Sequence, residues 1–141
     1  QPLQLLEPLT TVVVRISVRA KEEVGMPIVG YMLRNHLGID FSGTNSTRLG
    51  FELPPMLPGD INTVDFYIQL PELYPGSFSF SPAIADGTLL SYRICDWIDN
   101  AITLQMAPGE HQIYGYMHLP CRVEVNSRLG SENRVTETSL G

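Results

Sequence analysis

The sequence has little positive charge. Its 141 residues contain 9 Lys and Arg against 15 Asp and Glu, which gives a formal net charge of -6 at pH 7. Proteins that bind nucleic acid neutralise phosphates with clustered basic side chains, and this chain has no basic stripe. An anionic membrane surface attracts the same kind of basic cluster. The charge balance therefore argues against both nucleic acid and anionic membranes as partners.

Cysteine and long apolar runs are also scarce. Cys95 and Cys121 are the only cysteines, and each falls among apolar residues of an expected strand. We expect two buried free thiols, with a disulfide as the alternative. No apolar run approaches the roughly 20 residues of a membrane-spanning helix, and no signal peptide is visible. Because the chain starts with Gln1 rather than Met, we expect a fragment or a processed product.

The motifs of common catalytic sites are missing as well. The chain has neither a G-x-x-x-x-G-K-[ST] phosphate-binding loop nor a G-x-S-x-G nucleophile elbow. His36, His111 and His118 do not fall at the spacing of metal ligands. Asp96 and Asp99 are a candidate acid–base pair, but a solvated turn is the favoured interpretation. We therefore predict a domain that is not an enzyme and needs no cofactor and no metal.

Proline and glycine, by contrast, are frequent. Eleven prolines and twelve glycines separate short runs in which apolar and polar residues alternate, the period of a half-buried strand. The pattern predicts an all-β domain, an immunoglobulin-like or jelly-roll β-sandwich of about seven to nine mostly antiparallel strands. The expected strands cover residues 10–20, 26–35, 62–70, 77–84, 91–100, 101–106, 112–118 and 120–126.

The chain divides into three regions. Residues 1–9 contain two prolines among leucines and are expected to be an incoming linker. Residues 10–126 hold the expected strands and form the sandwich. Residues 127–141 have few large apolar side chains, so we expect a disordered tail.

The third and fourth expected strands flank a Pro-Gly turn, and we expect them to form an antiparallel pair. Tyr67 and Gln69 then lie on the polar face of one strand, beside Ser79 and Ser81 of the other. A broad aromatic ring next to small hydroxyl side chains leaves a shallow polar trough. Such a trough favours a flat, hydroxylated ligand over an apolar one.

Sugars stack their C–H faces on aromatic rings while amide, carboxylate and guanidinium groups bind the hydroxyls. Tyr67 is the strongest candidate because its alternation places it away from the core. Trp97 is explained equally well as a core residue, and Arg15 and Arg19 as solvated strand residues. The predicted carbohydrate-binding residues are Tyr67, Gln69, Ser79, Ser81, Arg15, Arg19 and Trp97, with Tyr92, Tyr114, Tyr116 and Asp65 as further candidates.

Four segments carry a family resemblance: GIDFSGTNS at 38–46, LPGDINTVDFYI at 57–68, LYPGSFSFSPAI at 73–84 and DWIDNAITL at 96–104. In order and spacing they resemble the C-terminal domain of Wzt, the ATP-binding subunit of O-antigen polysaccharide ABC transporters. The resemblance implies an immunoglobulin-like sandwich that binds the capped non-reducing terminus of the O-antigen polysaccharide and recruits it to the exporter. It assigns no ligand contacts to individual residues.

The resemblance also implies a setting. A nucleotide-binding domain with the ATPase activity would precede this chain, and the full-length protein would contact the transmembrane exporter subunit. The expected location is cytoplasmic, at the inner face of the cell membrane.

The resemblance further implies a homodimer, because such an exporter carries two copies of this subunit. Residues 112–126 form a long terminal β segment broken only at Leu119-Pro120, and a segment of this kind can cross to a neighbouring chain. We expect an exchanged C-terminal strand that involves Tyr114, Tyr116, His118, Val123 and Val125.

Two other functions stay open from the sequence. In one, the domain is a protein-interaction or dimerisation module in which Tyr114 and Tyr116 meet a protein and no glycan binds. In the other, it is a small glycan-modifying enzyme that uses Asp96 and Asp99.

Overall fold

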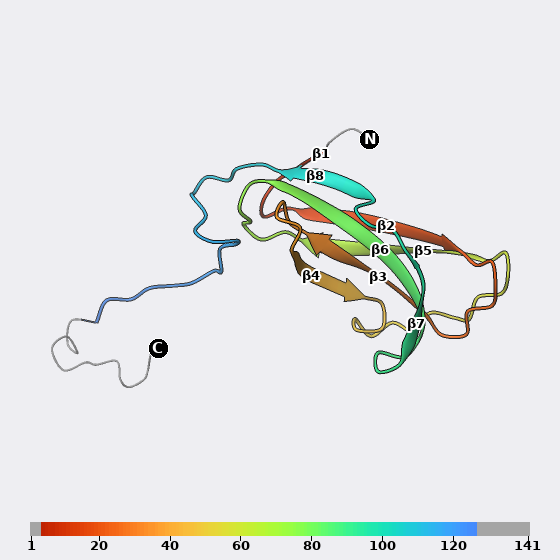
Figure 1. The fold of residues 1–141 in the computed structure, drawn as a ribbon. Helices are drawn as coiled ribbons and strands as arrows, with labels where there is room; N and C mark the ends of the chain where they lie inside the picture. The colour runs from red at the N-terminus through yellow and green to blue at the C-terminus, as the bar shows by residue number, and fades with distance from the viewer. Residues whose placement is uncertain (1–3, 127–141) are drawn as a thin grey trace.

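The chain folds into two β-sheets that pack on one another (Figure 1). The computed structural model describes residues 4–126, which contain eight strands and no helix. The predicted all-β fold with mostly antiparallel strands is therefore confirmed. The strands are β1 (Gln4–Leu6), β2 (Thr11–Arg19), β3 (Pro27–Arg34), β4 (Asp40–Asn45), β5 (Ile61–Gln69), β6 (Ser77–Gly87), β7 (Tyr92–Trp97) and β8 (Ile102–Met106).

β6 organises the larger sheet, whose strand order is β1-β8-β6-β3-β4. On one edge β6 pairs with β3, from Pro27↔Asp86 to Arg34↔Ser79. On its other edge it pairs with β8 and then with β7, so these two strands lie end to end. β1 adds to the sheet parallel to β8, while β4 pairs antiparallel with β3.

The break between β7 and β8 lies opposite Pro82. The N–H and C=O of a strand residue point to the same edge, and the carbonyl of Pro82 accepts the N–H of Ile98 at 3.0 Å. Proline has no N–H to donate in return, so the ladder is interrupted here. The chain bulges over residues 98–101 and rejoins β6 where the N–H of Ala101 donates to the carbonyl of Phe80 at 2.9 Å.

β2 and β5 form the smaller sheet, paired antiparallel from Thr11↔Gln69 to Arg19↔Ile61. Their alternating apolar side chains pack against the larger sheet, as the period-two pattern predicts. The inward-facing side chains are Val12, Val14, Ile16, Val18, Val64, Phe66 and Ile68.

Tyr31 of β3 joins the two parts of the core, since it packs against both clusters of buried residues. Its ring meets Phe66 of the smaller sheet edge-on at a centroid distance of 5.2 Å, and Phe80 of the larger sheet at 5.3 Å. Edge-to-face pairs of this kind stabilise a core beyond the area that they bury. Burial raises the pKa of the Tyr31 hydroxyl.

The predicted antiparallel pair of β5 and β6 is wrong. β5 pairs with β2 in the smaller sheet, whereas β6 lies in the larger one. The link between them crosses from sheet to sheet because Leu70 and Leu73 are buried in the core, each 4% exposed. A turn signal alone does not distinguish such a crossing from a hairpin. The trough expected between Tyr67 and the serines therefore does not form.

The strands expected at 112–118 and 120–126 are also wrong for the single chain. Beyond Met106 the described residues contain no strand, only an isolated bridge between Leu73 and Met117. The segment from 120 onward runs away from the two sheets (Figure 1). Val123 and Val125, which lie in the second of these expected strands, are 82% and 93% exposed, because no sheet edge of the described chain lies beside them.

Two smaller expectations differ from the structure, and a third falls outside the residues that it describes. Both cysteines are free, as expected, but both are exposed, so the predicted burial of the thiols is wrong. Cys95 lies on β7, whose residues are all exposed because it is an edge strand. Part of the expected linker forms β1 at the edge of the larger sheet. The expected disordered tail, residues 127–141, lies outside the described residues.

Replacing Phe80 tests the arrangement of the core. Phe80 is 2% exposed, and we expect Phe80→Ala to lower the free energy of unfolding by about 3–5 kcal/mol, because it removes buried surface and leaves a cavity. Urea unfolding followed by circular dichroism measures this change. Leu90→Ala is the control, since Leu90 is 98% exposed and its loss should change stability by less than about 0.5 kcal/mol. Equal effects of the two substitutions would contradict the assignment of Phe80 to the core.

Candidate ligand groove on the larger sheet

The outer face of the larger sheet is hollowed where its strands carry small residues. Gly30, Gly43, Ala83 and Ala85, on β3, β4 and β6, line a groove of about 340 Å³. Glycine at position 30 is a steric requirement, because an added Cβ would lie 2.4 Å from the carbonyl oxygen of Thr44. Glycine inside a strand often marks such a close approach. The missing side chains open the floor of the groove.

Aromatic and aliphatic side chains form one wall of the groove, and polar side chains lie on the other. Tyr92, Ile94 and Trp97 come from β7, whereas Asn45 and Arg48 come from the end of β4 and the turn that follows it. Arg48 is the only charged side chain among the lining residues. Aromatic rings combined with an amide and a guanidinium are the groups that bind sugars.

Trp97 is held in the wall by its indole N–H, which donates to Asp99 Oδ1 at 2.6 Å. Arg34 Nη2 lies 3.4 Å from the same carboxylate oxygen, and Arg34 Nε donates to Asp40 Oδ1 at 2.6 Å. The hydrogen bond to Asp40 raises the pKa of the Arg34 guanidinium. The Trp97 side chain is neither a core residue nor a freely rotating surface residue, at 39% exposed.

Asn100 closes the bulge between β7 and β8. Its φ of 50° lies in the left-handed region, which Asn tolerates better than most residues. Its backbone N–H donates to Ser81 Oγ at 2.9 Å, and Ser79 Oγ donates to its Oδ1 at 2.8 Å. Ser81 is 0% exposed. The two serines therefore anchor this loop, and the Ser81 hydroxyl is closed to a ligand in this structure.

The seven predicted binding residues fall on the outer sides of two different sheets. Tyr67 is 72% exposed, as its alternation predicts, but it lies on the smaller sheet. Trp97 alone of the seven lines the groove. The smaller sheet carries Arg15, Arg19, Tyr67 and Gln69, and the larger sheet carries Ser79, Ser81 and Trp97.

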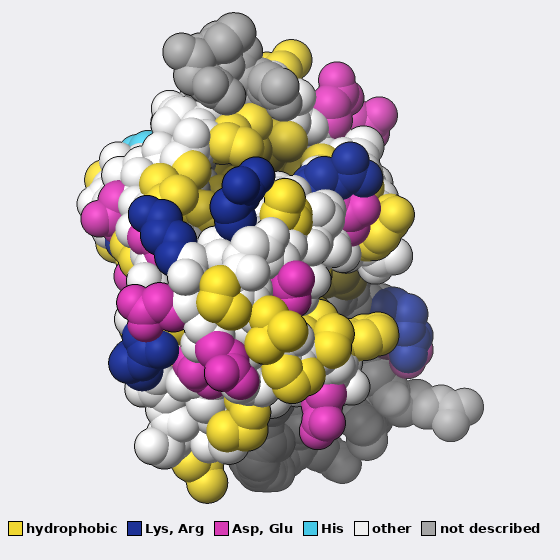
Figure 2. Space-filling view, turned by 90° about the vertical axis from the view of Figure 1, so that its right-hand side faces the viewer, with side chains coloured by type: hydrophobic (Ala, Val, Ile, Leu, Met, Phe, Trp, Pro, Cys, Tyr) yellow, Lys and Arg dark blue, Asp and Glu magenta, His cyan; other side chains and the backbone are white. Residues whose placement is uncertain are grey.

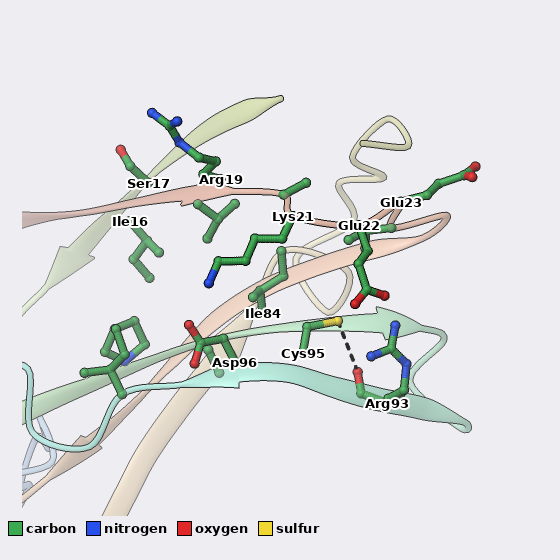
Figure 3. A pocket seen from close by; sticks show the side chains of 16 residues that line it. Ile16, Ser17, Arg19, Lys21, Glu22, Glu23, Ile84, Arg93, Cys95 and Asp96 are labelled. Carbon is green, nitrogen blue, oxygen red and sulfur yellow. Dashed lines mark hydrogen bonds between the residues drawn. The ribbon is translucent and has the colours of Figure 1, made fainter. Parts of the chain in front are cut away.

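A second hollow, of about 470 Å³, runs along the free edge of β2 (Figure 3). Its lining includes every residue from 16 to 24, and Arg93 and Cys95 of β7 lie across from them. β2 pairs with β5 alone among the described strands, so its other edge presents backbone N–H and C=O groups without a strand partner. Edges of this kind accept an added strand.

The charges on the surface agree with the composition. Seen from the end where the turn after β2 lies, Lys and Arg side chains are interspersed with Asp and Glu, and the largest group of hydrophobic side chains lies right of the centre, with smaller groups elsewhere on the face (Figure 2). This face carries no continuous basic patch. Among residues 4–126, no group of three or more His, Cys, Asp or Glu is placed to hold a metal ion. The same residues include no helix that would cross a membrane.

Most of the groove residues are absent from the set predicted from the sequence. Tyr92 was among the further candidates, but Asn45, Arg48 and Ile94 were not. A usable signal was present in the glycines inside strand-like runs, since Gly30 and Gly43 mark places where the sheet surface lacks side chains. Arg48 carries no such signal, because only the pairing of β4 with β3 brings its turn to the groove.

The structure defines an all-β, two-sheet domain with a groove on the outer face of its larger sheet. A similar fold is seen in the crystal structure of the C-terminal domain of Wzt, with a TM-score of 0.76 and 18% sequence identity over 86% of this chain and 73% of that one. No match was found among curated proteins. The family model of the Wzt C-terminal domain matches residues 1–119. The chain therefore belongs to the Wzt C-terminal domain family, which is associated with O-antigen ABC transporters.

The ion pair between Arg15 and Asp65, on the outer face of the smaller sheet, makes the stability of the domain depend on pH. Arg15 Nε and Nη2 donate to the two carboxylate oxygens of Asp65 at 2.8 and 3.1 Å, and this hydrogen bonding lowers the pKa of Asp65 below 3.8. A lowered pKa stabilises the folded state above the unfolded pKa, and this contribution is lost as the pH falls through the folded pKa. We expect Asp65→Asn to be slightly less stable than the wild type at pH 6, with the difference vanishing at low pH. Urea unfolding across this range measures it, and a difference that persists unchanged at pH 2 would contradict the pairing.

Proposed function

We propose that this domain is a non-catalytic carbohydrate-binding module, which recognises the capped non-reducing terminus of an O-antigen polysaccharide and recruits it to its ABC exporter. The observation that carries the proposal is the groove on the larger sheet, with Trp97 and Tyr92 in its wall. Its place of action is the cytoplasmic side of the cell membrane, where the full-length protein contacts the transmembrane exporter subunit. Membership of the Wzt C-terminal domain family supports this setting.

The dimensions and chemistry of the groove support a glycan ligand. The groove crosses from the β4 side to β7 over β3 and β6, and neighbouring strands lie about 4.8 Å apart, so its span is roughly 14 Å. This length exceeds one sugar ring. Trp97 offers a flat face for the C–H side of a sugar, while Arg48 and Asn45 bind hydroxyls from the opposite side. The chemistry needs neither a cofactor nor a metal.

Two aromatic substitutions locate the site. Trp97→Ala should weaken glycan binding at least tenfold, because it removes the stacking surface, whereas Tyr67→Ala on the other sheet should leave the affinity within about twofold. Calorimetric titration of the purified domain with O-polysaccharides measures both, with capped and uncapped chains of the same repeat side by side. The capped chain should bind more tightly than the uncapped one.

The opposite result has a clear meaning. If Tyr67→Ala abolishes binding and Trp97→Ala does not, the site lies on the smaller sheet. If no polysaccharide binds the folded wild-type domain, the glycan-binding proposal is wrong. The alternative is then a protein-interaction module, a function favoured by the exposure of Tyr114 and Tyr116, which are 83% and 52% exposed.

We propose further that the domain works as a homodimer with exchanged C-terminal segments. The free edge of β2 has no strand partner among the described residues, and the segment from 120 to 125 has an alternating apolar pattern but pairs with no strand. Added to the β2 edge of a second copy, Cys121, Val123 and Val125 would face the hollow beside Ile16. Arg122 and Glu124 would then face solvent.

The exchange is tested by the oligomeric state. The wild-type chain should be a dimer by light scattering, and Val123→Asp with Val125→Asp should shift it to a monomer, because two carboxylates would replace the apolar contacts with Ile16 and Ile84 and would lie in a hollow that already holds Glu22, Glu23 and Asp96. Arg122→Ala with Glu124→Ala is the matched control on the other face of the segment and should leave the dimer intact. A wild-type monomer, or a dimer that survives deletion from residue 120 onward, would refute the exchange.

A further inference from the structure

The loop that bulges between β7 and β8 holds the Trp97 side chain in the groove wall. These contacts form within the chain, without a ligand. Trp97 lies at the end of β7, and Asp99 lies two residues further on, in the bulge. The indole N–H donates to Asp99 Oδ1 at 2.6 Å, and the backbone N–H of Trp97 donates to Asp96 Oδ1 at 2.9 Å. The ring is thus held at its polar edge, while its face is left to the groove.

The Asp99 carboxylate is in turn held by the neighbouring strands. Arg34 of β3 places Nη2 at 3.4 Å from Asp99 Oδ1 and donates from Nη1 to Asn100 Oδ1 at 3.4 Å. Asp40 of β4 accepts from Arg34 Nε at 2.6 Å. A carboxylate that receives both an indole N–H and a guanidinium is oriented more firmly than one exposed to water alone.

The backbone of the bulge is fixed as well. Asn100 adopts a left-handed φ of 50°, its N–H donates to the fully buried Ser81 Oγ at 2.9 Å, and its side chain accepts from Ser79 Oγ at 2.8 Å. Asp99 therefore stands on a loop that is tied to β6 on one side and, through Arg34, to β3 and β4 on the other.

We propose that Asp99 is a positioning residue, which sets the Trp97 ring in the groove wall before the ligand arrives. The inference rests on the proposed glycan site, and it identifies the Asp99 carboxylate as the group that orients Trp97 there. An aromatic platform that is already oriented loses less conformational freedom on binding than a mobile one. Because the indole N–H is bound to Asp99, Trp97 meets the sugar through its face and donates no hydrogen bond to it.

The test uses the only tryptophan of the chain. Excited at a wavelength that the six tyrosines do not absorb, the intrinsic fluorescence of the wild-type domain reports on Trp97 alone. Acrylamide quenching and anisotropy then measure how freely its ring moves. Asp99→Ala should raise the quenching constant, lower the anisotropy and weaken polysaccharide binding by about two- to tenfold. Asp99→Asn keeps an acceptor oxygen for the indole and should restore most of both readouts.

Two further variants separate positioning from general damage. Arg34→Gln removes the guanidinium that orients Asp99 and should shift both fluorescence readouts in the same direction as Asp99→Ala. Asp65→Ala is the matched control, since Asp65 is also a carboxylate paired with an arginine but lies on the smaller sheet. It should leave the fluorescence and the affinity unchanged.

The outcomes distinguish this inference from the proposed function. If Asp99→Ala leaves quenching and anisotropy at wild-type values, Asp99 does not position the ring. If the ring is loosened but the affinity stays the same while Trp97→Ala abolishes binding, the positioning role is likewise refuted and the glycan site stands. If no polysaccharide binds the wild type, the glycan proposal fails, and the fluorescence readouts alone decide whether Asp99 holds the ring.

Discussion

One missing backbone N–H, that of Pro82, shapes the outer face of the larger sheet. β6 is paired along both edges, and a regular strand beside it would run without interruption from β7 into β8. Since Pro82 has no N–H to donate toward that edge, the ladder breaks and residues 98–101 bulge away. The bulge carries Asp99 and Asn100 and directly follows Trp97. The groove wall and the network that supports it are thus consequences of one residue type at one strand position.

The sequence was informative where a local pattern decides the outcome. Alternation in β2 and β5 predicted which side chains face the core, and it placed Tyr67 correctly in solvent. It did not predict which strands are neighbours, because the link between β5 and β6 has the same turn residues whether it forms a hairpin or crosses between sheets. The burial of Leu70 and Leu73 decides that question, and burial depends on the whole fold.

The same limit applies to the candidate site. From the sequence, Trp97 is explained equally well as a core residue and as a stacking surface for a sugar, since a single aromatic residue in a short strand fits either place. In the structure Trp97 is 39% exposed, and its indole N–H donates a hydrogen bond to Asp99. Arg48 and the small residues of the floor meet only when β4, β3, β6 and β7 lie side by side. These residues come from several strands and turns that are far apart in the sequence, so no local motif predicts that they meet.

β7 separates the two hollows of the domain. Alternation assigns the residues from Tyr92 to Cys95 to them, and the register shift opposite Ile84 and Ala85 returns Trp97 to the groove side. Tyr92 and Ile94 line the groove, whereas Arg93 and Cys95 line the hollow beside β2. All six residues of the strand are exposed in the single chain, so neither of its faces is covered. A segment from a second copy that filled the hollow would bury one face of β7 and leave the other free for the glycan. Dimer formation would then stiffen the strand that ends in Trp97. The proposed strand exchange and the proposed glycan binding would thus both involve β7.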